Sequence, residues 1–220
     1  MTVITLRLDE KHVFKDHPIE VLEDNNGIKK SYNLSLDQVV DLFSEAIDNG
    51  HSSPLLPKGI VHYFEKSSGW KKVWIDVAKE QRDIIYESNT ITVGFPRLLF
   101  GYTLSPNSNG DGYHVTLSNI LAVKGKGSIT EETEVFHFPY SHVQSGNVCM
   151  GGNRLPEIHD LTKLEVFHYL FFRSPFGSDY GAKTKSKEKL STLFLDRFNG
   201  KSFDDNELIS FNQTFSEWIN

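Results

Sequence analysis

The stretch that decides the reading of this chain surrounds its only cysteine and runs Phe136-His137-Phe138-Pro139-Tyr140-Ser141-His142-Val143-Gln144-Ser145-Gly146-Asn147-Val148-Cys149-Met150-Gly151-Gly152. An apolar, strand-like run ends at Pro139, and a polar loop with a glycine turn at Gly146 follows. Glycines on both sides leave the backbone around Cys149 open to a large, flat partner. The pattern is compatible with a reachable thiol, although spacing alone does not favour it. The alternative is a small buried side chain, which is the usual state of a lone cysteine.

Alternating apolar residues predict a series of strands before this stretch. The best defined of them runs from Phe95 to Leu104 and enters the sheet through Pro96. Short connections join the runs, which predicts an antiparallel meander sheet. The predicted strands span residues 59–64, 70–78, 83–86, 90–93, 95–104, 113–117, 120–123 and 134–138.

Helical patterns replace the strands after Cys149. Thr162 and Glu165 have the spacing of a capping box, and the helix they begin ends at the break over residues 173–177. A basic run over residues 183–189 is typical of an exposed helix face. Carboxylates at residues 204 and 205 suit the start of a last helix. The expected apolar faces consist of Leu164, Phe167, Leu170 and Phe171 in the first helix and of Leu208, Phe211, Phe215 and Trp218 in the last.

The N-terminal part of the chain reads as a small meander followed by a helix. Strands are predicted over residues 3–8, 19–22 and 29–34, with a turn at Asn25-Asn26-Gly27. Ser35 and Gln38 form a capping box, and Gly50 suits the end of the helix. The face expected to pack on a core consists of Leu36, Val39, Val40, Phe43 and Ile47.

The order of strands, helix, strands, cysteine loop and helices predicts an α+β fold. We expect residues 1–58 to form an N-terminal extension packed on a main domain of residues 59–220. A net charge of −6 gives no general attraction to nucleic acid or to an anionic membrane. One cysteine excludes an internal disulfide framework and suits a reducing cytosol. No apolar run has the length of a membrane span, and the start of the chain lacks the pattern of a signal peptide.

Three chemistries could use Cys149. A Cys–His hydrolase needs a base that contacts the thiol, and His142, His137, His159 and His114 are the candidates. A metal site is disfavoured because no paired ligand spacing is present, and nothing in the sequence requires a cofactor. The third chemistry is acyl carriage, in which the thiol accepts an activated carboxyl group as a thioester and passes it to an amine. That chemistry needs a groove for an extended tail and a hydrogen-bond donor near the carbonyl oxygen.

The stretch from Pro139 to Cys149 resembles the active-site signature of ubiquitin-conjugating enzymes. That signature is a His-Pro-Asn step followed by an apolar residue, a glycine, any residue, an apolar residue and the cysteine. The wider run, roughly residues 60 to 180, resembles prokaryotic ubiquitin-conjugating-enzyme-like family D, the group that contains PRTRC system protein B. The landmarks are Pro96, Leu99-Phe100, Pro139-Tyr140, Val143, Gly146, Val148-Cys149, Gly151, Pro156 and Phe171-Phe172-Arg173-Ser174-Pro175-Phe176, with a weaker match at Trp74 and Arg82.

The resemblance implies a ubiquitin-conjugating-enzyme-like core: a meander sheet flanked by helices, with the cysteine in a loop that leaves the last strand. It also implies that Cys149 is the nucleophile that forms a thioester with a ubiquitin-like protein. The expected partners are that protein, an adenylating activating enzyme and a metallopeptidase of the same system. Such prokaryotic sets occur on mobile elements and in antiphage defence islands.

The sequence departs from the signature at the asparagine that steadies the oxyanion. His142 stands before the apolar residue and Ser141 precedes it, and the step from His142 to Gly146 is one residue shorter than in the eukaryotic pattern. An imidazole can donate a hydrogen bond as an amide does, so His142 is a candidate for oxyanion stabilisation or lysine deprotonation. Its alternative is a surface residue of the loop. Asp160 is a candidate to orient or deprotonate an incoming lysine, and its alternative is an acidic residue near a helix start. These changes also keep open a non-catalytic scaffold of the same fold.

Overall fold

The computed structural model describes residues 2–8, 16–46 and 54–219. The chain separates into two units, residues 1–52 and 53–220. The expected boundary at residue 58 and the expected packing of the N-terminal extension on the main domain stay predictions.

The first unit is a three-stranded antiparallel sheet with one helix, and its strand order is β1-β2-β3. A tight turn at Asn26 and Gly27 joins β2 to β3, where the turn was predicted. Ser35 Oγ accepts from the Gln38 N–H at 3.1 Å and Gln38 Oε1 accepts from the Ser35 N–H at 2.9 Å, so the capping box is confirmed. The elements are β1 (Thr2–Leu8), β2 (Ile19–Asn25), β3 (Ile28–Leu34) and α1 (Leu36–Ala46).

The apolar face of α1 is largely open to solvent. Val39 is buried, but Leu36, Val40 and Phe43 are each at least half exposed. These three residues therefore do not join a core within the described part of their own unit, and their packing against another surface stays a prediction. Ile47 and the predicted stop at Gly50 lie outside the described residues.

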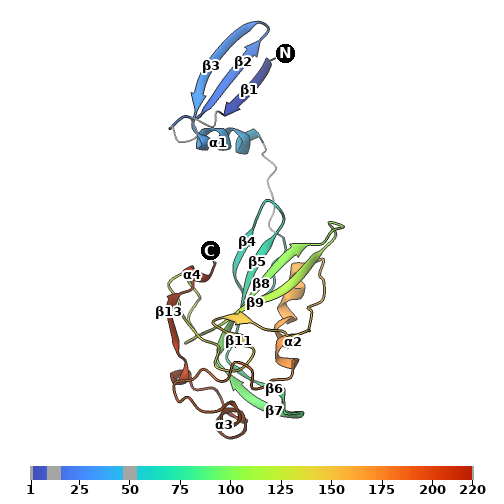
Figure 1. Ribbon diagram of the computed structural model, residues 1–220, viewed down its shortest axis with the longest axis vertical. Coiled ribbons are helices and arrows are strands. Elements are labelled where there is room, and N and C mark those ends of the chain that lie inside the picture. Colours follow the sequence, from blue (N-terminus) through green and yellow to red (C-terminus); the bar gives the residue numbers. More distant parts are fainter. Residues whose placement is uncertain (1, 9–15, 47–53, 220) are drawn as a thin grey trace. The chain divides into compact units, whose positions relative to one another are not determined.

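The second unit is built on an antiparallel sheet in the order β11-β12-β9-β8-β5-β4, and β10 pairs with both β9 and β13. Figure 1 shows α2 on one side of this sheet and β13 on the other. The strands are β4 (Ile60–Glu65), β5 (Lys71–Val77), β8 (Arg97–Pro106), β9 (Tyr113–Val123), β10 (Glu134–Phe136), β11 (Val143–Gln144), β12 (Asn147–Val148) and β13 (Ser210–Thr214). A separate hairpin consists of β6 (Glu80–Tyr86) and β7 (Asn89–Phe95). The predominance of antiparallel strands with a few helices confirms the α+β prediction.

Alternation along the strands explains why the sheet has two cores. Phe100 faces the side that carries α2 and contacts Phe171 and Phe172, with ring centroids 6.0 and 5.8 Å apart. Trp74 and Leu99 face the other side, where the Trp74 ring meets Phe215 edge-on at 5.3 Å. Because side chains alternate with a period of two, the central strands β5, β8 and β9 contribute to both cores.

The helical segments differ from the predicted ones. The residues after Cys149 form a 3₁₀ turn, η2, and then α2, and the predicted C-terminal helix is mostly strand β13. The Glu134↔Thr214 and Phe136↔Ser210 pairs attach β13 to β10, and a left-handed Asn212 interrupts any helix there. The segments are η2 (Leu161–Val166), α2 (His168–Arg173), α3 (Leu190–Thr192), η3 (Leu193–Arg197), η4 (Asp205–Glu207) and α4 (Ser216–Ile219). Among the described residues, no helix has the length and apolar character needed to cross a membrane.

Candidate functional site

A two-residue hairpin holds Cys149 in place. Val143 pairs with Val148 and Gln144 pairs with Asn147. The connecting residues Ser145 and Gly146 both have positive φ, 48° and 78°, which matches the right-handed twist of the flanking strands. The Cys149 N–H donates to the His142 carbonyl at 2.8 Å. Cys149 and His142 therefore face each other across the open end of the hairpin.

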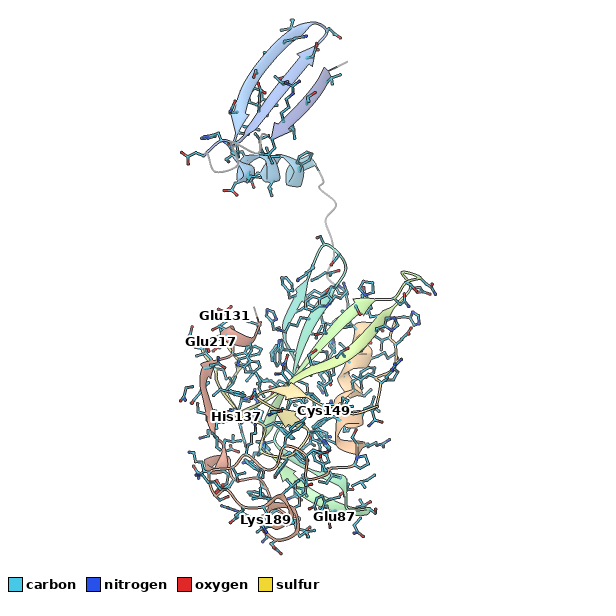
Figure 2. The ribbon with its side chains drawn as sticks, viewed as in Figure 1. Glu87, Glu131, His137, Cys149, Lys189 and Glu217 are labelled. Atoms are coloured by element: carbon cyan, nitrogen blue, oxygen red, sulfur yellow. The ribbon has the colours of Figure 1, made fainter. Side chains whose placement is uncertain are left out.

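The hairpin is attached to the sheet on one side and to the C-terminal segment on the other. Asn147 pairs with Asn119 of β9, and the Ile120 N–H donates to the Gly146 carbonyl at 3.0 Å. The Trp218 ring packs so closely that a Cβ on Gly146 would lie 2.5 Å from it. The position of Cys149 thus depends on the turn, on β9 and on Trp218. Figure 2 shows the labelled Cys149 beside this short hairpin.

The thiol is exposed at the rim of a hollow of about 300 Å³. Another wall comes from the end of α2 and the residues after it, which together form the distinctive Phe-Phe-Arg-Ser-Pro-Phe run of the sequence. The hollow is lined by His142, Cys149, Met150, Gly151, Gly152, Asn153, Phe171, Ser174, Pro175 and Asp179. Two stretches about 25 residues apart in the chain therefore build one site.

His142 lies in this hollow, but one of its ring nitrogens is already engaged. Nε2 lies 2.9 Å from the Pro175 carbonyl oxygen, and the ring lies 5.2 Å from that of Phe176. A carbonyl only accepts, so Nε2 carries the proton in the neutral ring and Nδ1 is an acceptor. A neutral His142 therefore offers the site a base and no free donor. Its backbone is left-handed with φ 71°, a conformation that costs a residue with a side chain about 1–2 kcal/mol.

Asp160 is not among the residues that line the hollow. Its carboxylate accepts from the Thr162 N–H at 2.9 Å and from the Thr162 hydroxyl at 2.8 Å. These hydrogen bonds lower the pKa of Asp160, because they stabilise the charged form. Asp160 is the N-cap of η2, which was the alternative reading of this residue. The predicted capping box of Thr162 and Glu165 is wrong, since Asp160 takes the capping position.

Tyr180 is a neighbour of the thiol that the sequence reasoning missed. Hydrogen bonding with Cys149, together with the charge of Cys149 and of Asp179, raises the pKa of Tyr180. The phenol therefore stays protonated at neutral pH and can donate. Tyr180 has φ 64° in a turn closed by the Gly181 N–H and the Ser178 carbonyl. The only signal in the sequence is the turn-forming Asp179-Tyr180-Gly181, which indicates no chemistry.

The other histidines that were candidate bases are engaged elsewhere. His114 Nδ1 lies 3.0 Å from Glu157 Oε1, His159 Nδ1 lies 3.4 Å from Asp111 Oδ1, and His137 stacks on Phe211. None of the three lines the hollow beside Cys149. Over residues 2–8, 16–46 and 54–219, no group of three or more His, Cys, Asp or Glu side chains could hold a metal ion.

A family model described as prokaryotic E2 family D matches residues 46–211. The chain belongs to this family. The match includes the whole hairpin, Cys149, Tyr180 and the Phe-Phe-Arg-Ser-Pro-Phe run. It connects the protein with ubiquitin-like conjugation. The comparisons with curated proteins and with solved structures gave no match.

Proposed function

We propose that this member of prokaryotic E2 family D carries a ubiquitin-like protein as a thioester on Cys149 and transfers it to an amine. The observation that carries the proposal is the exposed sulfur of Cys149, held at the end of a hairpin at the rim of a hollow and next to the hydroxyl of Tyr180. Family membership supports it, because Cys149 lies within the residues that match the model of prokaryotic E2 family D.

The proposed reaction has two steps that balance. The Cys149 thiolate attacks the activated carboxyl carbon of the ubiquitin-like protein, a C–S bond forms, and the activating group leaves with its electron pair. An amine then attacks the thioester carbonyl, a C–N bond forms, the thiolate leaves, and the nitrogen loses a proton. Both steps pass through a tetrahedral oxyanion, which a hydrogen-bond donor stabilises. We assign the role of this donor to Tyr180, whose hydroxyl contacts the sulfur. We assign to Nδ1 of His142 the role of accepting the proton that the amine loses.

The partners belong to the proposal. Cys149 is loaded by an adenylating activating enzyme with a ubiquitin-like protein, and a metallopeptidase of the same system releases or matures the modifier. A thiolate carrier needs a reducing compartment, which suits the cytosol. The setting on mobile elements and in defence islands is the expected genomic context.

The first prediction tests the carrier role. Mixing the protein with its activating enzyme, ATP and the ubiquitin-like protein should give an adduct that thiols cleave, visible as a mass shift on a non-reducing gel. Cys149→Ala should abolish it, because no other thiol exists in the chain. Cys149→Ser should give an adduct that resists thiols but not hydroxide, since an oxyester replaces the thioester.

The outcomes separate the competing functions. An adduct that persists in Cys149→Ala would contradict the carrier role. Failure of the wild-type protein to form any adduct would favour the non-catalytic scaffold. Hydrolysis of a model ester that needs Cys149 and no activating enzyme would favour the Cys–His hydrolase.

A further inference from the structure

The outer edge of β9 is paired at both ends and open between them. Tyr113 exchanges two hydrogen bonds with Ile158, at 2.7 and 3.1 Å, so its backbone groups point away from β8. At the other end Asn119 pairs with Asn147 of the cysteine hairpin. Because backbone direction alternates along a strand, Val115 and Leu117 also present their N–H and C=O groups to this outer edge. No backbone hydrogen bond from another segment of the described chain reaches either residue.

A second hollow lies along this open edge. It measures about 390 Å³ and is lined by His114, Val115, Thr116, Leu117, Val148, Met150, Asn153, Arg154 and Leu155. Met150 and Asn153 also line the hollow at Cys149, so the two spaces adjoin. The unpaired backbone groups therefore lie beside two adjoining hollows, one of which has the thiol at its rim, and we call the two together the channel.

The register fixes the direction of a chain in this channel. β12 is antiparallel to β9 with Asn147 opposite Asn119, so Cys149 leaves the sheet near Leu117. A peptide whose carboxyl end reaches Cys149 must run from Tyr113 towards Leu117, parallel to β9. Four residues of extended chain span about 13 Å, which is the distance along β9 from Tyr113 to Leu117.

We propose that the C-terminal tail of the ubiquitin-like protein binds here as an added parallel strand on β9, pairing with Val115 and Leu117. This inference rests on the proposed function and names where its substrate binds. The occupant is a protein tail because the channel follows an unpaired strand edge and ends at a nucleophile that, in the proposed function, needs a carboxyl terminus. Added strands gain affinity from main-chain hydrogen bonds and tolerate varied side chains.

The test uses peptide thioesters that react with Cys149 without an activating enzyme. The parent probe is acetyl-Ala-Leu-Ala-Ala-Gly-Gly as the thioester of mercaptoethanesulfonate. The second probe has the same sequence with N-methyl groups on residues three to five from the carboxyl end, which removes their N–H donors. The third probe is acetyl-Gly-Gly thioester, which cannot reach the edge. The full-length protein is mixed with each probe, and the rate of mass increase at Cys149 is measured.

We expect the parent probe to load Cys149 about tenfold faster than either of the other probes, which corresponds to about 1.4 kcal/mol. Val115→Pro removes the outward N–H of β9, a change that an edge position tolerates, and should reduce the tenfold difference to twofold or less. Val115→Ala is the matched control, since it shortens the same side chain but keeps the N–H and should keep the difference.

Equal rates for the parent and N-methylated probes would overturn the strand pairing while leaving the carrier role of Cys149 intact. A tenfold difference that survives in Val115→Pro would overturn it as well. If no probe forms a thioester while iodoacetamide still labels Cys149, the proposed function fails and this inference fails with it.

Discussion

Around Cys149, hydrogen bonding decides which neighbour can donate to a carbonyl oxygen. His142 uses Nε2 on Pro175, so the neutral ring has only an acceptor left. Tyr180 is a phenol and is protonated at neutral pH, and hydrogen bonding with Cys149 raises its pKa further. Both residues are held in left-handed backbone conformations, which persist only where the surrounding structure imposes them. In the proposed mechanism Tyr180, 31 residues after the thiol in the sequence, takes the role of the asparagine missing from the signature.

The second prediction tests this donor. Tyr180→Phe removes only the hydroxyl and should slow thioester formation with acetyl-Gly-Gly thioester about tenfold, because one hydrogen bond to the oxyanion is lost. The melting temperature should not change, since Tyr180 is largely exposed. Tyr169→Phe is the matched control, as Tyr169 is similarly exposed on α2 and lines neither hollow. A rate for Tyr180→Phe equal to that of Tyr169→Phe would remove Tyr180 from the mechanism.

Among the elements, the hairpin of β11 and β12 has the largest effect on the site. It places Cys149 opposite His142, and it is clamped between β9 and Trp218. The turn needs glycine at position 146 for two reasons, a left-handed backbone and the absence of space for a Cβ.

The third prediction separates these two reasons. Gly125→Ala and Gly146→Ala replace glycines with nearly the same φ, 77° and 78°, but only Gly146 has neighbours within 4 Å. Gly125→Ala should lower the free energy of unfolding by about 1 kcal/mol through backbone strain alone. Gly146→Ala should cost about 1–3 kcal/mol more, because its methyl group collides with Trp218. Urea unfolding of both variants measures this difference. Equal losses in the free energy of unfolding would mean that the Trp218 ring moves aside without a cost in stability.

The strands before Cys149 could be predicted from sequence, because apolar and polar residues alternate along them and turn residues follow them. The C-terminal segment could not, since Leu208, Phe211 and Phe215 have helical spacing. The partner that makes this segment a strand is β10, which lies about 75 residues earlier in the chain. In the site, Cys149 and the Gly146 turn have local signals. Tyr180 has none, because its contact with Cys149 depends on the path of the chain around α2.

For the molecule as a whole, the main core couples folding to pH through one histidine. His168 is buried on α2 with its ring 5.9 Å from that of Phe100. Burial, reinforced by the charge of Arg82, lowers the pKa of His168 from 6.5 to about 4. His168 is therefore harder to protonate in the folded protein than in the unfolded chain.

The fourth prediction follows from this difference. Between pH 6.5 and pH 4 the unfolded chain binds a proton at His168 that the folded protein does not, so stability falls as pH falls through this range. The loss from this residue should reach up to about 3 kcal/mol at pH 4. His168→Gln does not titrate, so its free energy of unfolding should decline less over the same range in urea titrations. Parallel pH profiles for the two proteins would show that His168 is not the cause.

The ring of Trp218 rests on the turn that carries the sulfur, while Trp74 is sealed inside the sheet. Any shift of that turn when a large acyl group is loaded or discharged would alter the surroundings of the Trp218 indole. The surroundings of the buried Trp74 indole would stay unchanged. The protein thus contains its own optical reporter next to the reacting atom, and turnover could be followed by intrinsic fluorescence with no dye on the only thiol.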